Sequence, residues 1–306
     1  MQGFIETAVI ANNINTGDPA WNYSDTQNNL FVGGVVCENY GEVENVTANL
    51  TISHESQTIL KKEGQGATVT SYLGGLVGAN YKTVRDSLFT GEIVLNTKGD
   101  GVENVYVGGF VGQNFPEAIV VECGASGEIK EESGEISSLS VGGFTYLNAG
   151  GINNSYTQMN ITTTSVGQES DLTGGFVALN KYTVSSSYAS GKVQTASVGK
   201  IGGFVADHLG GVIIACISSG DFELATAEKF GAFAYESDSI LSWCVYQSDA
   251  VITVNGEVYE YVADGQTAEA MELENIYTEA VIFKKVSWSS DIWTLESGLP
   301  TFTEEN

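Results

Sequence analysis

A glycine pair followed by apolar residues recurs along this chain, and it limits the possible folds more than any other feature. Successive pairs lie 28 to 41 residues apart, and in the last pair Ala232 replaces the second glycine. The seven pairs begin at Gly33, Gly74, Gly108, Gly142, Gly174, Gly202 and Gly231. Self-similarity at such a period indicates a repeat architecture, in which one supersecondary unit is stacked many times.

Each repeat continues with the same order of residue types. In five repeats an asparagine lies six residues after the first glycine, and a branched apolar residue and then a small residue follow it. The apolar runs are short, rich in Val, Ile, Phe and Tyr, and bounded by Gly, Asn and Ser, which indicates strands and turns. The asparagines are Asn39, Asn80, Asn114, Asn148 and Asn180, and His208 and Ser237 hold the same place in the last two repeats.

The repeat predicts an all-β fold, a right-handed parallel β-helix (β-solenoid) of about eight coils, with three strands and three turns in each coil. Each coil stacks on the next at about 4.8 Å, so like residues align in columns. We expect glycine where the backbone turns with positive φ, asparagine in a ladder, and aromatic rings stacked inside. A β-propeller needs longer units, and a β-sandwich would not repeat so regularly.

Two repeats carry a recognisable motif. Residues 74–80 (Gly-Gly-Leu-Val-Gly-Ala-Asn) and 108–114 (Gly-Gly-Phe-Val-Gly-Gln-Asn), with the downstream Asn-Ser-Tyr at 154–156, resemble the GLUG motif. GLUG repeats occur in bacterial surface proteins and in the region ahead of the catalytic domain of some immunoglobulin A metalloproteases. The resemblance therefore implies a non-catalytic, exported β-helix. Residues 288–302 also resemble the segment that commonly closes such arrays.

The repeat divides the chain into three expected regions. Residues 1–29 are expected to form an N-terminal cap or a partial coil, residues 30–255 the GLUG-repeat β-helix, and residues 256–306 a C-terminal capping segment. Caps are needed because the open sheet edges at the ends of a solenoid invite edge-to-edge aggregation.

The C-terminal segment no longer follows the repeat. A helix is expected from Thr267 to Asn275 and a strand over residues 280–283, which together predict a small α+β cap. Trp288 and Trp293 are expected to cover the last coil, and an aromatic platform for carbohydrate is the alternative.

Charge limits the kinds of partner. Lys and Arg total 12 against 38 Asp and Glu, a formal net charge of −26, so we expect neither nucleic acid nor anionic lipid as a partner. No stretch approaches the roughly 20 apolar residues of a membrane span, and no membrane insertion is expected in this segment. The acidic, lysine-poor surface suits an extracellular or bacterial cell-surface location, with the signal peptide absent from this sequence.

The cysteines fall into the columns of small residues. Cys123, Cys216 and Cys244 align with serines, and Cys37 aligns with glycine and alanine, so we expect small buried fillers. A disulfide between Cys216 and Cys244, neighbours in adjacent coils, is the alternative. The absence of Cys-x-x-Cys argues against structural zinc, and no metal site is expected, although weak surface Ca²⁺ binding stays open.

The sequence offers few groups for catalysis. Its two histidines, His54 and His208, do not form His-Glu-x-x-His, and His208 replaces a ladder asparagine, which favours a turn role. The acidic residues are scattered without an Asp-x-Asp, which is typical of a solvated face. We therefore expect no enzyme, no catalytic residue and no cofactor.

Aromatic residues follow the ladder asparagines. Tyr40, Tyr81 and Phe115 each come directly after one, and Tyr182 lies one place further on. If that turn is exposed, the rings form a stripe that could bind a sugar or a protein. The alternative is ring stacking that only stiffens the turn. A second column is expected to be core: Leu76, Phe110, Phe144, Phe176, Phe204 and Phe233.

These observations favour a non-catalytic, adhesin-like β-helix module at the cell surface or outside the cell, a monomer that binds an unidentified host surface protein or glycan. One alternative is the substrate-recognition region of a larger secreted protease. Another is a polysaccharide-active β-helix enzyme, which would need carboxylates converging in a groove.

Overall fold

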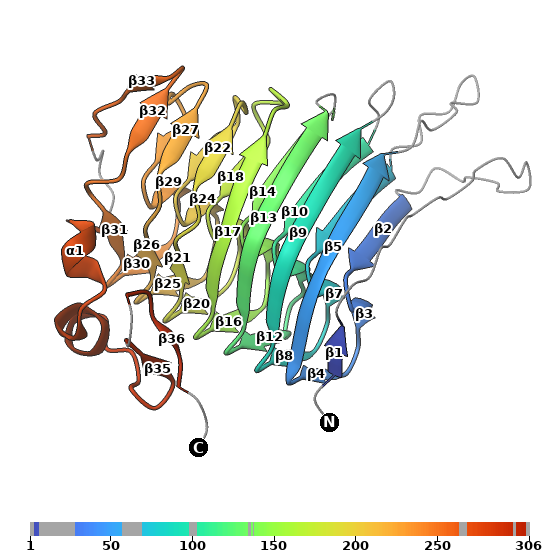
Figure 1. The fold of residues 1–306 in the computed structure, drawn as a ribbon, viewed down its shortest axis with the longest axis horizontal. Helices are drawn as coiled ribbons and strands as arrows, with labels where there is room; N and C mark the ends of the chain where they lie inside the picture. The colour runs from blue at the N-terminus through green and yellow to red at the C-terminus, as the bar shows by residue number, and fades with distance from the viewer. Residues whose placement is uncertain are drawn as a thin grey trace, which may run out of the picture.

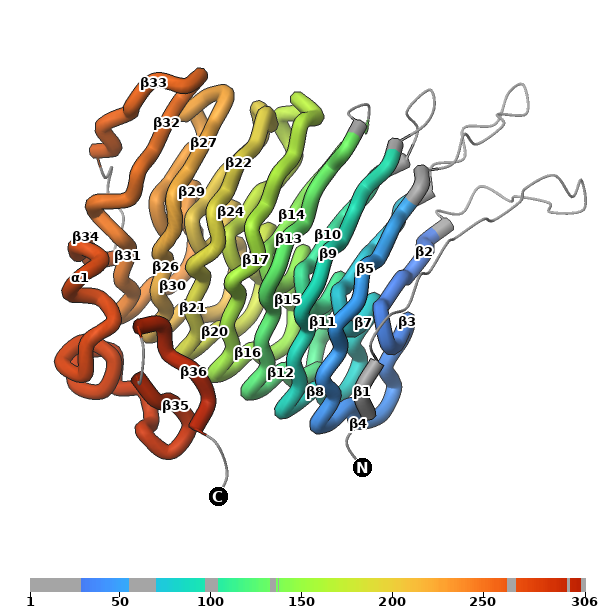
Figure 2. Tube along the Cα trace, viewed as in Figure 1, coloured from blue at the N-terminus to red at the C-terminus, as the bar shows by residue number. Residues whose placement is uncertain are grey.

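The fold is an all-β parallel solenoid. The computed structural model describes residues 3–5, 28–56, 69–97, 103–133, 136, 138–262, 268–295 and 298–303. Equivalent strands of successive coils lie side by side, and each coil is one layer of the rod (Figure 1). Figure 2 follows the backbone through these layers in the same view. The predicted fold class is therefore confirmed.

Each coil passes through four sheets, one more than expected, because the glycine pair makes a corner between two short strands. Sheet B holds β2 (Asn28–Gly33), β6 (Val69–Gly74), β10 (Glu103–Gly108), β14 (Ser138–Gly142), β18 (Leu172–Gly174), β23 (Lys200–Gly202) and β28 (Phe230–Gly231). Sheet C follows the glycines with β3 (Val36–Asn39), β7 (Val77–Asn80), β11 (Val111–Asn114), β15 (Thr145–Asn148), β19 (Val177–Asn180), β24 (Val205–His208) and β29 (Ala234–Ser237).

The other two sheets complete the coil. Sheet D holds β4 (Glu42–Glu44), β8 (Thr83–Arg85), β12 (Ile119–Val121), β16 (Gly151–Asn153), β20 (Val184–Ser185), β25 (Val212–Ile214) and β30 (Ile240–Ser242). Sheet A begins with β1 (Gly3–Ile5), β5 (Val46–Ser56), β9 (Leu88–Thr97), β13 (Gly124–Ser133) and β17 (Tyr156–Thr163). It continues in paired short strands: β21 (Tyr188–Ala189) and β22 (Val193–Thr195), β26 (Ile217–Ser218) and β27 (Phe222–Leu224), β31 (Val245–Gln247) and β32 (Ile252–Val254).

Sheets B, C and D have seven strands each, so the expected count of about eight coils is slightly too high. The register pairs like with like. Gly108 lies opposite Gly74 and Gly142, and Asn114 lies opposite Asn80. The predicted alignment of equivalent residues in columns is therefore confirmed.

The column of aromatic residues that was expected inside the rod forms its centre. Phe110, Phe144, Phe176, Phe204 and Phe233 are fully buried, as is Leu76. Neighbouring phenylalanine rings stack with centroids 4.7–5.0 Å apart, close to the spacing of adjacent strands. One repeat position thus fills the same place in every layer.

The glycine pairs are selected by close approach and not by backbone conformation. Neither Gly108 nor Gly109 has a positive φ, so the prediction of left-handed turns at the pairs is wrong. A Cβ on Gly108 would lie 1.9 Å from the carbonyl oxygen of Val111, and one on Gly109 would lie 2.1 Å from that of Gly143. Both distances are far inside van der Waals contact, so neither glycine can be replaced without moving the backbone. In the last coil, where Ala232 is the second residue of the pair, no further coil of the described chain stacks on this corner.

Left-handed backbone occurs at a different corner, between sheets D and A. One residue per coil there has a φ of 48° to 56°: Asn45, Asp86, Glu122, Asn154, Ser186, Ala215 and Trp243. Asn and Asp tolerate this conformation better than other residues with a side chain. The left-handed conformation therefore accounts for the Asn or Asp residue that three of the seven coils have at this position.

The C-terminal segment differs from the prediction in its elements. Glu269–Met271 forms strand β34, which pairs in parallel with β31, where a helix was expected; Thr267 lies outside the described residues. The helix α1 is short, Leu273–Ile276, and residues 280–283, expected as a strand, belong to the π-helix η1 (Ala280–Lys285). Residues 269–271 pair with the open edge of β31, and these backbone hydrogen bonds outweigh the helix preference of the segment.

Both tryptophans lie against the side of the rod, and the expectation that they cover the last coil is wrong. Trp288 and Trp293 are 3% and 1% exposed, and they pack with Tyr188 and Ile217 on the outer face of sheet A. Trp288 Nε1 donates to the carbonyl oxygen of Ala215 at 2.7 Å. Their burial also contradicts the alternative of an exposed carbohydrate platform.

Short strands complete the C-terminal segment. The hairpin of β35 (Trp293–Thr294) and β36 (Thr301–Phe302) lies beside the lower ends of the sheet A strands (Figure 1). The hydroxyl of Tyr188 donates to the carbonyl oxygen of Pro300 at 2.8 Å and joins this hairpin to the rod. Strand β33 (Glu257–Val258) pairs antiparallel with β32 at the other end of the same sheet. Strands β33 and β34 thus occupy the C-terminal edge of sheet A, which limits edge-to-edge pairing there.

Candidate functional site

The buried asparagine ladder positions the predicted aromatic stripe. Asn80 Nδ2 donates to Asn114 Oδ1 at 3.0 Å, and Asn114 Nδ2 donates to Asn148 Oδ1 at 2.9 Å. The residue that follows each asparagine begins the turn into sheet D. At this place Tyr81 and Phe115 donate their backbone N–H groups to the backbone carbonyl oxygen of the asparagine in the preceding coil, each at 2.9 Å. These hydrogen bonds hold the backbone of the turn that carries the rings.

Three of the four predicted residues form one stack, which we call the aromatic stripe: Tyr40, Tyr81 and Phe115. The ring centroids of Tyr40 and Tyr81 are 4.6 Å apart with 4° between the planes, and those of Tyr81 and Phe115 are 4.2 Å apart with 20°. Tyr40 is 66% exposed, whereas the other two are half-buried. The stripe thus presents ring surface to solvent on a rigid turn.

The Tyr40 hydroxyl donates to Oε2 of Glu38 at 2.8 Å. This hydrogen bond to a carboxylate raises the pKa of Tyr40 to about 12. Burial raises the pKa of Tyr81. Both tyrosines therefore stay neutral hydrogen-bond donors at physiological pH.

Tyr182 is not part of the stripe. Ala149 takes the ring position in the intervening coil, and its side chain cannot continue the stack. Tyr182 is 53% exposed and has no ring contact with the other described aromatic residues. It is a separate exposed tyrosine two coils beyond Phe115.

Four further rings that the sequence reasoning missed extend the stripe around the glycine corner. We call Phe31, Tyr72, Tyr106 and Tyr146 the aromatic corner. Tyr72 stacks on Phe31 at 5.3 Å, Tyr106 stacks on Tyr146 at 4.3 Å, and Tyr72 lies 6.1 Å from Tyr146. Phe31 meets Phe115 edge-on at 6.4 Å, which joins the two groups into one surface of seven rings.

A sequence signal for the aromatic corner existed. Phe31, Tyr72 and Tyr106 each lie two residues before the first glycine of a pair, and the residue between them and the glycine is buried. Alternation along a strand then places the ring on the outer face. Tyr146 has no such signal, because Gly78 and Gly112 hold its position in earlier coils.

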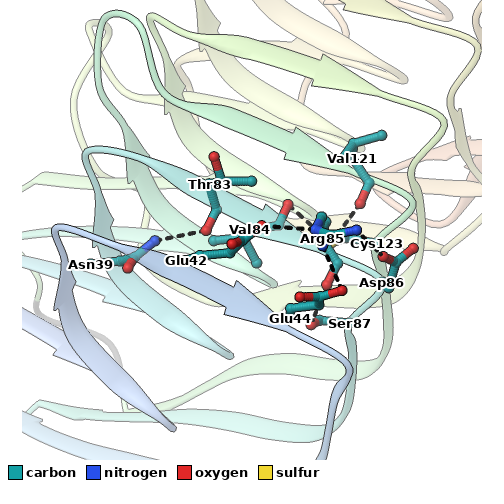
Figure 3. A network of polar contacts seen from close by, with 10 residues as sticks. All are labelled: Asn39, Glu42, Glu44, Thr83, Val84, Arg85, Asp86, Ser87, Val121 and Cys123. Atoms are coloured by element: carbon teal, nitrogen blue, oxygen red, sulfur yellow. Dashed lines mark hydrogen bonds and ion pairs between the residues drawn. The ribbon is translucent and has the colours of Figure 1, made fainter.

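A charged cluster lies on sheet D (Figure 3). Its strands β4 and β8 come directly after the turns of Tyr40 and Tyr81 in the chain. Arg85, the only arginine, forms ion pairs with Glu42 at 2.9 Å, Glu44 at 2.6 Å and Asp86 at 3.4 Å. The hydrogen bond to Glu42 is the main cause of the raised pKa of Arg85. Three carboxylates surround one cation, so the cluster keeps a negative excess and Arg85 is not free to bind an anion.

Three of the four cysteines are buried fillers, as predicted. Cys123, Cys216 and Cys244 are buried, and each thiol donates to the carbonyl oxygen two residues earlier, as Ser155 and Ser187 do. Burial raises the pKa of all three thiols, that of Cys244 to about 11. All are free, so the alternative of a Cys216–Cys244 disulfide is wrong.

Cys37 does not fit the filler prediction. It is exposed on β3, which is the edge strand of sheet C among the described residues.

His208 takes the ladder position as predicted. Its Nδ1 lies 3.0 Å from Asn180 Nδ2, and its Nε2 lies 3.3 Å from the carbonyl oxygen of Ile240. His54 is buried in β5. The described residues contain no group of three or more His, Cys, Asp or Glu side chains arranged to hold a metal ion.

Fold and site together define a parallel β-solenoid with an aromatic outer surface and a ladder-filled interior. No family model matches the chain, and no curated protein matches it. The described helices are all too short to cross a membrane. The resemblance to GLUG repeats stays a prediction.

Proposed function

We propose that the chain is a non-catalytic, adhesin-like binding module of an exported bacterial protein, with the aromatic stripe as its ligand surface. The observation that carries this proposal is the ordered stack of Tyr40, Tyr81 and Phe115 on the outside of a rigid rod. Exposed aromatic surface that is already ordered costs little conformational entropy on binding. Host surface protein or glycan is the proposed class of partner.

Two observations support the location and the absence of chemistry in this proposal. The net charge of −26 suits a protein exposed outside the cell, and so does the resemblance to GLUG repeats. Two buried carboxylates make structural hydrogen bonds within the fold. Glu131 accepts backbone N–H groups of Thr164 and Ser165 at 2.9 and 2.8 Å, and Asp171 accepts the hydroxyl of Ser138 at 2.6 Å.

The test is a glycan and host-protein binding array probed with the purified chain and with a Tyr40→Ala/Tyr81→Ala variant. We expect one or more ligands to bind the chain and to lose binding to the variant. A Tyr259→Ala variant is the matched control, because Tyr259 is also exposed but lies after β33 in the last coil. Turnover of any arrayed glycan or peptide by the chain would contradict the proposal, as would equal binding by all three proteins.

A further inference from the structure

The stack in the aromatic stripe restricts how a ligand can use its rings. Tyr81 has Tyr40 on one face and Phe115 on the other, with centroids 4.6 and 4.2 Å away. A sugar ring or a planar cation needs an open ring face, where the negative potential of the π-system lies. Tyr40 begins the stack, so one of its faces has no aromatic neighbour among the described residues. Phe115 ends the stack on the other side but is half-buried, whereas Tyr40 is 66% exposed. Tyr40 therefore offers the most accessible ring face of the stripe, which gives little room for a chain of sugars.

One carboxylate contacts Tyr40, and others lie on the same coils as the stripe. Glu38 accepts the Tyr40 hydroxyl at 2.8 Å and is itself exposed. The Arg85 cluster with its three carboxylates lies on β4, on β8 and at the residue after β8. Exposed Glu117 lies two residues after Phe115, at the other end of the stripe. Lys82 is the one exposed cation beside the stripe without an ion pair in the described chain. The surroundings of Tyr40 are therefore negative, and they complement a positively charged ligand.

We propose that the ligand of the aromatic stripe is a basic polypeptide segment that lays an arginine guanidinium on the open face of Tyr40. This inference rests on the proposed function and narrows its partner class from protein or glycan to a basic protein. Guanidinium is planar and weakly hydrated, so it stacks on an aromatic face while its N–H groups pair with a carboxylate. Glu38 is the carboxylate within reach of that face. The charge of −26 speeds the encounter with such a segment.

Titration calorimetry in 0.15 M salt with four probes tests the inference: nona-arginine, nona-lysine, cellohexaose and chitohexaose. We expect nona-arginine to bind most tightly. Tyr40→Ala should weaken its binding on the order of ten-fold, and Glu38→Gln should weaken it about three-fold or more.

Matched controls come from the other end of the rod. Tyr259→Ala and Glu257→Gln change the same residue types at and after β33, far from β3 along the rod (Figure 1). Both should leave the affinity for nona-arginine within about two-fold. Circular dichroism melting of each variant shows that the fold is kept.

Three outcomes overturn the inference, and they separate it from the proposed function. If Glu38→Gln and Glu257→Gln weaken nona-arginine equally and Tyr40→Ala does not, the peptide is held by net charge alone. If an oligosaccharide binds through Tyr40 and neither peptide does, the inference fails and the proposed binding function stands. If none of the four probes binds, the inference fails, whereas the array decides the proposed function independently.

Discussion

Two stacks of aromatic rings run along the same rod, one inside and one outside. Inside, Phe144, Phe176 and Phe204 stack with centroids 4.7 Å apart and planes 4° to 8° apart. Outside, Tyr40 and Tyr81 stack at 4.6 Å and 4°. The geometry is nearly the same because both stacks inherit the spacing of adjacent coils. The inner rings are fully buried and Tyr40 is 66% exposed.

The stacking geometry of a ring therefore follows from the coil spacing, and it does not show whether the ring serves stability or binding. Removing water from a ring, not the contact with the next ring, supplies most of the free energy. The inner stack therefore holds the solenoid together, whereas the outer stack is available for binding. Substitutions in the two stacks should therefore differ in their effect on stability.

The largest expected effect is in the inner stack. Phe176→Ala should lower the free energy of unfolding by about 3–5 kcal/mol, because it leaves a cavity between two buried rings. Tyr81→Ala in the outer stack should cost about 1 kcal/mol. Urea unfolding followed by circular dichroism measures both, and hydrogen exchange shows whether the loss stays within the neighbouring coils. If both variants lost the same free energy of unfolding, the inner stack would contribute no more to stability than the outer one.

The asparagine ladder lies between the two stacks and should give the next largest effect. Asn114→Ala removes the side-chain partner of Asn80 Nδ2 and of Asn148 Oδ1, both of which are buried. We expect the free energy of unfolding to fall by about 2–3 kcal/mol. Asn49→Ala, at an exposed position of β5, serves as the control and should change it by less than about 0.5 kcal/mol. A ladder variant as stable as the control would show that the ladder does not support the turn.

His208 makes one ladder position sensitive to pH. Burial lowers the pKa of His208 below the ordinary 6.5, and this effect outweighs the hydrogen bond to the carbonyl oxygen of Ile240, which raises the pKa. The unfolded chain therefore takes up the proton first as pH falls. The stability of the neutral form is complete above about pH 6.5 and is lost progressively toward the lower folded pKa.

Replacing His208 by Asn restores the ladder residue of the earlier coils and removes the titrating group. The free energy of unfolding measured at pH 7.5 and pH 5.5 should fall less for the His208→Asn variant than for the chain itself. The carboxylates titrate alike in both proteins, so the difference isolates His208. An identical fall in both proteins would refute the prediction.

The smallest expected effect concerns an exposed ring outside both stacks. Trp243 is 63% exposed and has a φ of 53°, in the column where Asn154 and Asp86 hold the same left-handed conformation. Trp243→Asn should raise the free energy of unfolding by about 0.5–1 kcal/mol, because Asn tolerates this backbone better. Asn154→Ala should cost a similar amount, and thermal melting of the two variants checks both signs. A lower melting temperature for Trp243→Asn would show that the ring makes a stabilising contact.

Much of the fold could be predicted because a repeat makes each residue a member of a column. The phenylalanine core, the asparagine ladder with His208 and the thiol column at Cys123 were all readable from alignment of the repeats. Inside the repeat, the prediction was wrong about the backbone at the glycine pairs and the number of strands in a coil. Outside the repeat, it was wrong about whole elements, as in the strand at Glu269–Met271 and the π-helix at Ala280–Lys285. Those elements depend on an open sheet edge and an apolar side of the rod, which are properties of the assembled coils.

Three of the seven rings of the aromatic surface could be predicted as well. Tyr40, Tyr81 and Phe115 share one repeat position, so their stacking followed from the columns. Tyr182 shares that turn but not that position, and Ala149 breaks the stack before it. The link from Phe115 to Phe31 crosses the glycine corner between two sheets, and only the angle of that corner brings these rings together.

By itself, the sequence determined that equivalent residues stack at the spacing of adjacent strands, because the same apolar positions recur in every repeat and each coil buries them against the next. Tertiary structure alone decided how the four sheets turn against each other and where the C-terminal segment lies. The physical reason is that stacking along the rod is set by local hydrogen bonding and side-chain pattern. Contacts across a corner, and along the side of the rod, depend on surfaces that exist only after the coils have assembled.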